Sequence, residues 1–125
     1  MQRLCTLLLV SLLLAGCSGS QTTQAESAGG TADSLIKTCA AGRPHDSLEL
    51  LSPPARDFLL SRPNATTGCL DLLGVRSASE LNGTRVVSVH ANDLSATAEL
   101  RSPDGRRTHL ELEKVRGVWS VMHPR

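Results

Sequence analysis

Histidines and cysteines are the side chains with the clearest chemical potential in this sequence, and their spacing limits what they can do. The histidines are His45, His90, His109 and His123. No two of them are four residues apart, as a pair of ligands on one helix would be, so a metal site would require convergence through the tertiary fold. We therefore expect no metal site and no cofactor, and we interpret His90 and His109 as surface residues on the polar faces of strands.

The cysteines are Cys5, Cys17, Cys39 and Cys69. Redox-active pairs usually occur as C-x-x-C, whereas Cys39 and Cys69 are 30 residues apart. Cys5 lies in an apolar stretch near the N-terminus and Cys17 lies directly after that stretch. The fate of all four residues therefore depends on what the N-terminal segment is.

The N-terminal segment has the pattern of a secretory signal. Arg3 and the terminal amine supply a short positive region, and residues 4–16 are predominantly apolar. A run of about 13 residues is shorter than the roughly 20 needed to cross a bilayer, but it fits the apolar region of a signal peptide.

The end of this segment, Leu14-Ala15-Gly16-Cys17, resembles the lipobox of bacterial lipoproteins. The resemblance implies that residues 1–16 are removed and that Cys17 carries a diacylglycerol thioether and a fatty acid, such as palmitate, on its new amine. Two or three acyl chains give stable membrane anchoring. With Ser18 after Cys17, the expected location is the outer membrane in a diderm host, or the outer leaflet of the plasma membrane in a monoderm host.

A location outside the cytoplasm decides how Cys39 and Cys69 are interpreted. Disulfides persist in that compartment, and two cysteines remain once Cys17 is acylated and Cys5 is removed. We therefore expect a Cys39–Cys69 disulfide that links the first helix of the domain to the third. Closing a loop of this length stabilises the fold by about 3–4 kcal/mol in the chain-entropy model.

The mature chain divides into a linker and one domain. Residues 17–30 hold Ser, Gly, Thr, Gln and Ala with a single charge, so we expect a flexible tether. Residues 31–125 form a small domain. Aromatic residues make up 2% of the chain, so its core must consist mainly of Leu, Val and Ala.

The periodicity of the domain changes from helical to alternating halfway along. We expect a helix that starts at Asp33 or Ser34 and stops at Gly42, a short turn at 47–51, and helices over 53–61 and 66–73. Val-rich or alternating segments predict strands over 84–91, 94–102, 107–115 and 117–123. Leu94, Ala96, Ala98 and Leu100 should share the apolar face of the second strand. The expected class is α+β, with N-terminal helices packed on a curved four-stranded antiparallel sheet.

This order resembles the cone-shaped nuclear-transport-factor-like (cystatin-like) superfamily, in which helices pack into the concavity of a curved sheet. The resemblance rests on the "LLSPPARDFL" segment, on the strand meander from Arg85, and on its last strand with Gly117, Trp119 and Val121. Some enzymes of the superfamily use an Asp–His pair inside the cone. Asp71 and His90 are the nearest residues of those types, but no motif places them there, and we assign no catalytic residue.

Composition excludes one class of function and leaves others open. The formal net charge is +1 without a basic run, which argues against nucleic-acid binding. We expect a non-enzymatic envelope lipoprotein, anchored to membrane lipid through Cys17, that binds an envelope protein or a small apolar ligand. The alternatives are a polyketide-cyclase-like isomerase or hydrolase with a pocket lined by Asp71 or His90, and a structural or exclusion lipoprotein.

Overall fold

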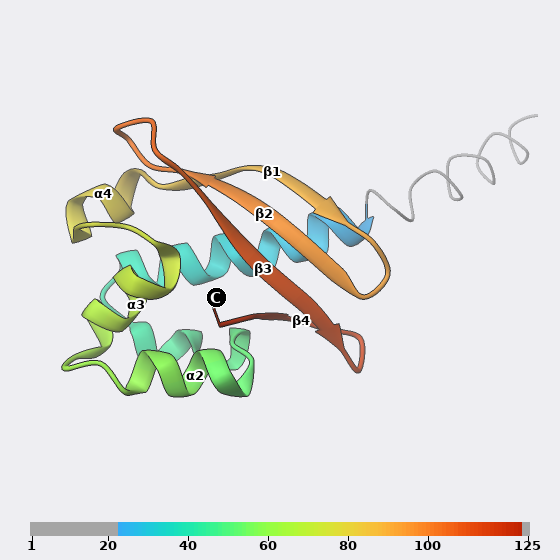
Figure 1. Cartoon of the computed structure of the whole chain (residues 1–125), viewed down its shortest axis with the longest axis horizontal. Helices are drawn as coiled ribbons and strands as arrows, with labels where there is room; N and C mark the ends of the chain where they lie inside the picture. The colour runs from blue at the N-terminus through green and yellow to red at the C-terminus, as the bar shows by residue number, and fades with distance from the viewer. Residues whose placement is uncertain (1–22, 124–125) are drawn as a thin grey trace, which may run out of the picture.

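The computed structural model describes residues 23–123, whose arrangement is shown in Figure 1. Helical segments come first in the chain, and a four-stranded antiparallel sheet follows them. Buried residues from the helices and from one sheet face form a single core, which confirms the expected α+β class. Among residues 23–123, no helix combines the length and apolar composition needed to cross a membrane.

The first helix is longer than the sequence pattern predicted. It covers residues 23–40, whereas we expected it to start at Asp33 or Ser34. The interpretation of residues 17–30 as a flexible linker is therefore wrong over residues 23–30, and residues 17–22 lie outside the described part of the chain. The expected stop is confirmed, because Gly42 follows the helix with φ 72°.

Small side chains explain why the beginning of this helix resembled a linker. Ala28 and Ala32 are fully buried and lie on one helix face. Gly29 lies so close to β1 (Arg85–Ala91) that a Cβ on it would stand 3.1 Å from Val89 Cγ2. A buried face made of Ala and Gly lacks the large apolar residues by which an amphipathic helix is recognised in a sequence.

Three further segments lie close to their expected positions, although the first starts at Pro44 and not at Ser47, and two of them have side-chain caps. They are the 3₁₀ helix η1 (Pro44–Leu50), α2 (Pro53–Leu60) and α3 (Ala65–Leu73). The side chains of Ser52 and Asn64 accept backbone hydrogen bonds in the first turns of α2 and α3, and thereby cap them. Gly74 ends α3 in the left-handed conformation, with φ 69°.

The short helix α4 (Ala78–Gly83) was not predicted. Ser77 Oγ accepts a hydrogen bond from the Glu80 backbone N–H, and a Glu80 carboxylate oxygen accepts one from the Arg76 N–H. This arrangement is close to a capping box. The S-x-x-E spacing was visible in the sequence, but only Leu81 of this helix is buried, so no apolar period supported it.

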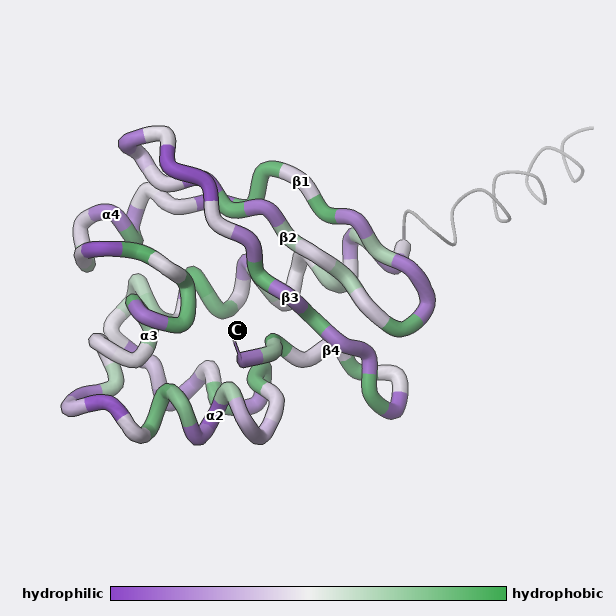
Figure 2. The backbone as a smooth tube through the Cα atoms, in the orientation of Figure 1, coloured by the Kyte–Doolittle hydropathy of each residue, from purple (hydrophilic) through white to green (hydrophobic). Residues whose placement is uncertain are grey.

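The four strands lie in the order β1-β2-β3-β4, each antiparallel to the next. After β1 they are β2 (Ser95–Arg101), β3 (Arg107–Val115) and β4 (Val118–Val121). Figure 2 shows hydrophobic and hydrophilic residues alternating along β3. Leu94 departs from the expected apolar face of β2 because it precedes the strand in a turn, where its side chain is 68% exposed.

A β-bulge in β1 changes which valines face the core. The register shifts between Val86 and Ser88, so Val86 and Val89 both pack against the core while Val87 is exposed. A strict two-residue period would place Val87 on the inner face and Val86 on the outer face, and the bulge reverses both assignments. His90 lies on the outer, exposed side, as the sequence predicted.

Aliphatic side chains dominate the core. Its largest fully buried members are Leu35, Leu59, Leu73, Leu81, Leu100, Leu112 and Val121. Trp119 is the one aromatic residue in the buried cluster of the described chain. Ser52 N–H donates to Val121 O at 2.8 Å, and Leu51 forms a parallel bridge with Val121, so the segment before α2 lies against the β4 edge.

Candidate functional site

Three arginines lie side by side on the outer face of the sheet. Arg85 of β1 is the partner of Arg101 of β2, and Arg101 is the partner of Arg107 of β3. Paired residues on neighbouring antiparallel strands have Cα atoms about 4.5–5.5 Å apart and side chains on the same face. We call this set the arginine row.

Little negative charge offsets the arginine row. Arg107 Nη1 lies 3.7 Å from Glu99 Oε1, and the same oxygen lies 3.8 Å from His109 Nε2. Within residues 23–123, neither Arg85 nor Arg101 forms an ion pair. Like charges directly opposite each other destabilise a sheet, so the row is not explained by a contribution to folding.

The tight turn between β2 and β3 holds two members of the row in register. Ser102 Oγ and the Arg106 N–H both donate to Asp104 Oδ1, at 3.0 and 3.1 Å. The hydrogen bond from the Arg106 backbone is the main reason that the pKa of Asp104 lies below its ordinary value of 3.8. Gly105 completes the turn with φ 86°, so Arg101 and Arg107 lie opposite each other directly beyond it.

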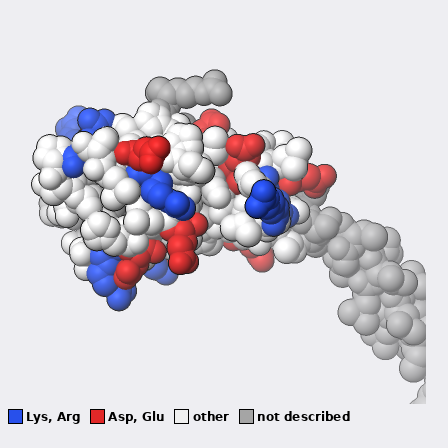
Figure 3. All heavy atoms as spheres, turned by 90° about the horizontal axis from the view of Figure 1, so that it is seen from below, with Lys and Arg blue, Asp and Glu red and all other residues white. Residues whose placement is uncertain are grey.

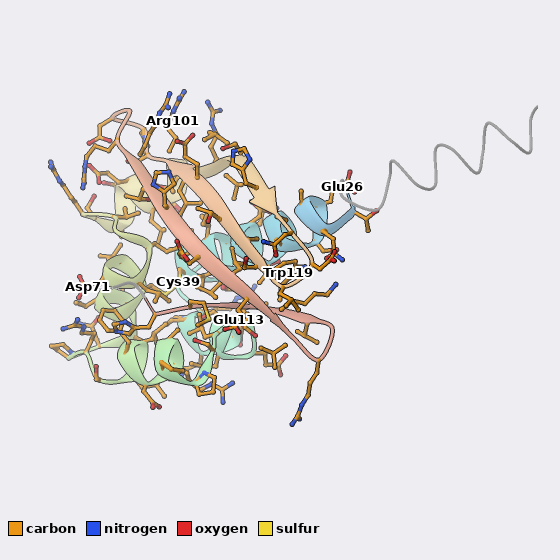
Figure 4. All side chains as sticks on the ribbon, turned by 45° about the vertical axis from the view of Figure 1, so that its right-hand side comes forward. Glu26, Cys39, Asp71, Arg101, Glu113 and Trp119 are labelled. Atoms are coloured by element: carbon orange, nitrogen blue, oxygen red, sulfur yellow. A yellow bond between two sulfur atoms is a disulfide. The ribbon has the colours of Figure 1, made fainter. Side chains whose placement is uncertain are left out.

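The polarity of the outer face changes from one end to the other. Beyond the arginine row the paired residues include Glu99 and His109, then Thr97 with Glu111, then Ser95 with Glu113. Figure 4 shows Arg101 at one end of the sheet and Glu113 toward the other. By contrast, the helical face in Figure 3 has charges of both signs interspersed. The arginine row is therefore a local concentration of positive charge on a chain with a net charge of +1.

The structure does not bring Asp71 and His90 together in one pocket. Asp71 lines a surface pocket of about 720 Å³ between α2 and α3, together with Phe58 and Arg62. Its carboxylate Oδ2 lies 3.4 Å from Arg62 Nε, and about half of its side chain is exposed. The Arg62 guanidinium also lies 4.2 Å from the centre of the Phe58 ring. Asp71 is therefore an ion-paired surface carboxylate.

His90 lies in a different place, at the end of the β1–β2 hairpin. It lines a pocket of about 320 Å³ with residues of the turn and of β2, including Asn92 and Thr97. None of the lining residues of this pocket is acidic. His90 therefore has no carboxylate beside it in the pocket that an acid–base pair would require.

The remaining histidines are dispersed. His109 lies beside Glu99 on the outer face. The His123 ring packs edge-on against the Phe58 ring, with the two ring centres 4.4 Å apart. His45 is exposed in η1. In the part of the chain that the structure describes, no three His, Cys, Asp or Glu side chains are grouped as they would be around a metal ion.

The cysteine predictions have different outcomes. Cys39 and Cys69 form a disulfide, with Cα atoms 5.9 Å apart, which joins the first helix to α3 as expected. Cys17, the expected lipid attachment point, lies outside the described residues, and so does the rest of residues 1–22. Lipidation of Cys17 therefore remains a prediction from the sequence.

Sequence reasoning missed the arginine row because its members are far apart in the chain. The rest of β1, a turn and the rest of β2 lie between Arg85 and Arg101, so no basic run marks them. A signal was present: Arg101 and Arg107 flank the five-residue turn segment 102–106 symmetrically, and an antiparallel hairpin pairs residues in such positions.

No family model, curated protein or solved structure matches this chain.

Proposed function

We propose that this protein is a lipid-anchored lipoprotein of the bacterial cell envelope whose domain binds an acidic protein surface through the arginine row. The lipobox-like Leu14-Ala15-Gly16-Cys17 supports the anchoring. The arrangement of Arg85, Arg101 and Arg107 in one lateral line supports the binding role. The resemblance to the nuclear-transport-factor-like superfamily stays a prediction from the sequence.

The chemistry of the row suits carboxylates. A guanidinium group stays charged at physiological pH and presents donors that match a carboxylate in a bidentate manner. Neighbouring strands are about 4.8 Å apart, so adjacent guanidiniums can contact neighbouring acidic side chains of a partner. Arg85 and Arg101 have no competing ion pair among the described residues.

The surroundings of the row favour a protein over a small apolar ligand. β1 is an edge strand, so its outer backbone groups can pair with an extended segment of a partner. The face beside the row carries Thr97, Glu99 and His109, which can donate or accept further hydrogen bonds. The two pockets described above are lined by polar and charged as well as apolar groups, which suits an apolar ligand poorly.

In vivo photocrosslinking tests this function directly. A photoreactive amino acid replaces His109, whose side chain is largely exposed beside the row. The expected result is one discrete adduct in intact cells. Arg85→Glu, Arg101→Glu and Arg107→Glu together should abolish that adduct, because they reverse the charge of the surface that the partner contacts.

A charge-matched control separates a specific site from net charge. Lys37→Glu, Arg43→Glu and Arg56→Glu change the net charge equally, but these exposed residues lie on helical elements and the loop between them. The control variant should keep the adduct. Absence of any discrete adduct, or an adduct that survives reversal of the arginine row, contradicts the proposed binding role.

A further inference from the structure

Three exposed apolar side chains gather at one end of the molecule. Leu94, Val115 and Val118 are 68%, 50% and 59% exposed. Val115 and Val118 are partners across the β3–β4 hairpin, and the Lys114 N–H donates to Leu94 O at 2.8 Å. The tips of the β1–β2 and β3–β4 hairpins therefore lie next to each other. We call these three residues the apolar tip.

The apolar tip lies at the end where the described chain begins. Lys114 Nζ donates to Gln24 Oε1 at 2.9 Å, which joins the β3–β4 hairpin to the first helix near its start. Figure 1 shows both hairpin turns at the same end of the molecule as the first described residues of that helix. The apolar tip and the start of the first helix therefore lie at the same end of the molecule.

We propose that the apolar tip inserts into the lipid surface to which Cys17 is attached, and so fixes the orientation of the domain. This inference rests on the lipid anchoring in the proposed function. Five residues lie between Cys17 and Thr23, and the six extended steps from one residue to the other reach about 20 Å at most. The tether thus holds the tip close to the bilayer, where a high effective concentration lets a small apolar contact form.

The composition of the tip favours lipid over a second copy of the chain. A stable protein interface needs about 800 Å² from each partner, which three side chains on two hairpin tips do not supply. The charges beside them are balanced: Asp93 and Glu113 are offset by Lys114 and Arg116. Insertion should therefore depend on apolar contact and change little with salt or with lipid charge.

Such docking would direct the arginine row away from the membrane. Arg101 and Arg107 lie at the end of the sheet opposite to Ser95 and Glu113, the pair nearest the apolar tip. Seven residues of β2 span about 20 Å, so the row would stand roughly that far above the tip. The same contact that orients the domain would therefore present the row to a partner in the envelope.

The test uses the acylated full-length lipoprotein in phosphatidylcholine vesicles, with a polarity-sensitive fluorophore on an introduced thiol. Asp93→Cys places the label beside Leu94, and Asn82→Cys places it in α4, far from the tip. The label at position 93 should shift to the blue and be quenched several-fold by lipids carrying a quencher in their acyl chains. The label at position 82 should keep the emission of a water-exposed fluorophore and should not be quenched.

Substitutions identify the cause of the signal. Leu94→Gln, Val115→Thr and Val118→Thr together should return the label at position 93 to a water-like emission, while the protein still floats with the vesicles. Leu60→Gln with Val87→Thr, which alter exposed apolar residues elsewhere, should leave the signal unchanged. The docking is wrong, while the lipid anchoring stands, if the otherwise unaltered protein floats but its label at position 93 has the emission of a water-exposed fluorophore and is not quenched.

A separate variant addresses the anchor. Cys17→Ser, produced with residues 1–16 omitted so that the apolar signal segment is absent, should abolish flotation, because the three-residue tip alone does not hold the protein on vesicles. If this variant floats as well as wild type, the lipid anchoring is wrong, and the docking that rests on it is wrong as well.

Discussion

Gly68 of α3 lies directly against the backbone carbonyl of Leu59 of α2. A Cβ on Gly68 would meet Leu59 O at 2.5 Å, and that oxygen belongs to a helix backbone that cannot simply rotate away. The two helices therefore approach each other as closely as they do because position 68 has no side chain.

Gly68→Ala should accordingly destabilise the domain by about 1–3 kcal/mol, the usual cost of overpacking. Urea unfolding, followed by the fluorescence of the single tryptophan Trp119, measures the change. Gly30→Ala is the matched control, because nothing lies within 4 Å of a Cβ at that position. This control should gain about 0.5–1 kcal/mol from helix propensity, and equal effects of the two substitutions would contradict the packing argument.

Loss of the Cys39–Cys69 disulfide should lower the free energy of unfolding by about 3–4 kcal/mol. The double variant Cys39→Ala, Cys69→Ala and the reduced wild type should show similar urea midpoints. A reducing agent should have no further effect on the double variant. If reduction leaves the midpoint of the wild type unchanged, the crosslink does not contribute as the loop-closure argument requires.

Ala28→Glu should cost at least about 2 kcal/mol, because it places a charge where a small buried side chain packs. Ser27→Glu adds the same charge at the neighbouring exposed position and should change stability by less than about 0.5 kcal/mol. Thermal unfolding followed by circular dichroism compares the two variants. Equal midpoints would mean that residues 23–30 are not part of the folded domain.

Asp104 should make the stability of the domain depend on acidic pH. Its pKa in the folded state is lowered from 3.8, so its contribution is fully present above pH 3.8 and is lost as the pH falls through the lowered value. Asp104→Asn keeps an oxygen acceptor for the Arg106 N–H but does not titrate. Urea midpoints of this variant should vary less between pH 5 and pH 2 than those of the wild type.

The ion pair between Asp71 and Arg62 should contribute little. Both side chains are substantially exposed, and such pairs are worth about 0–1 kcal/mol. Asp71→Asn should therefore leave both the unfolding midpoint and the photocrosslinked adduct at position 109 unchanged. Loss of that adduct in this variant would place the partner-binding surface near α3 and contradict its assignment to the arginine row.

The local elements were largely predictable because their signals are local. Caps such as Ser52 and Asn64, the stop at Gly74 and the alternation along β2 depend on residues a few positions apart. The errors arose where packing overrode the pattern. Ala28 is buried without being large, and the bulge after Val86 reverses the face that a two-residue period assigns.

The candidate sites also differ in whether nearby residues or the tertiary fold define them. The sequence by itself determined the lipobox-like motif around Cys17 and the pairing of Cys39 with Cys69, since these rest on adjacent residues or on simple counting. Only the tertiary structure decided that Arg85, Arg101 and Arg107 form one row, and that Leu94 lies beside the β3–β4 hairpin. The physical reason is strand register, which aligns residues that are distant in the chain and is set by turns and a shared buried face.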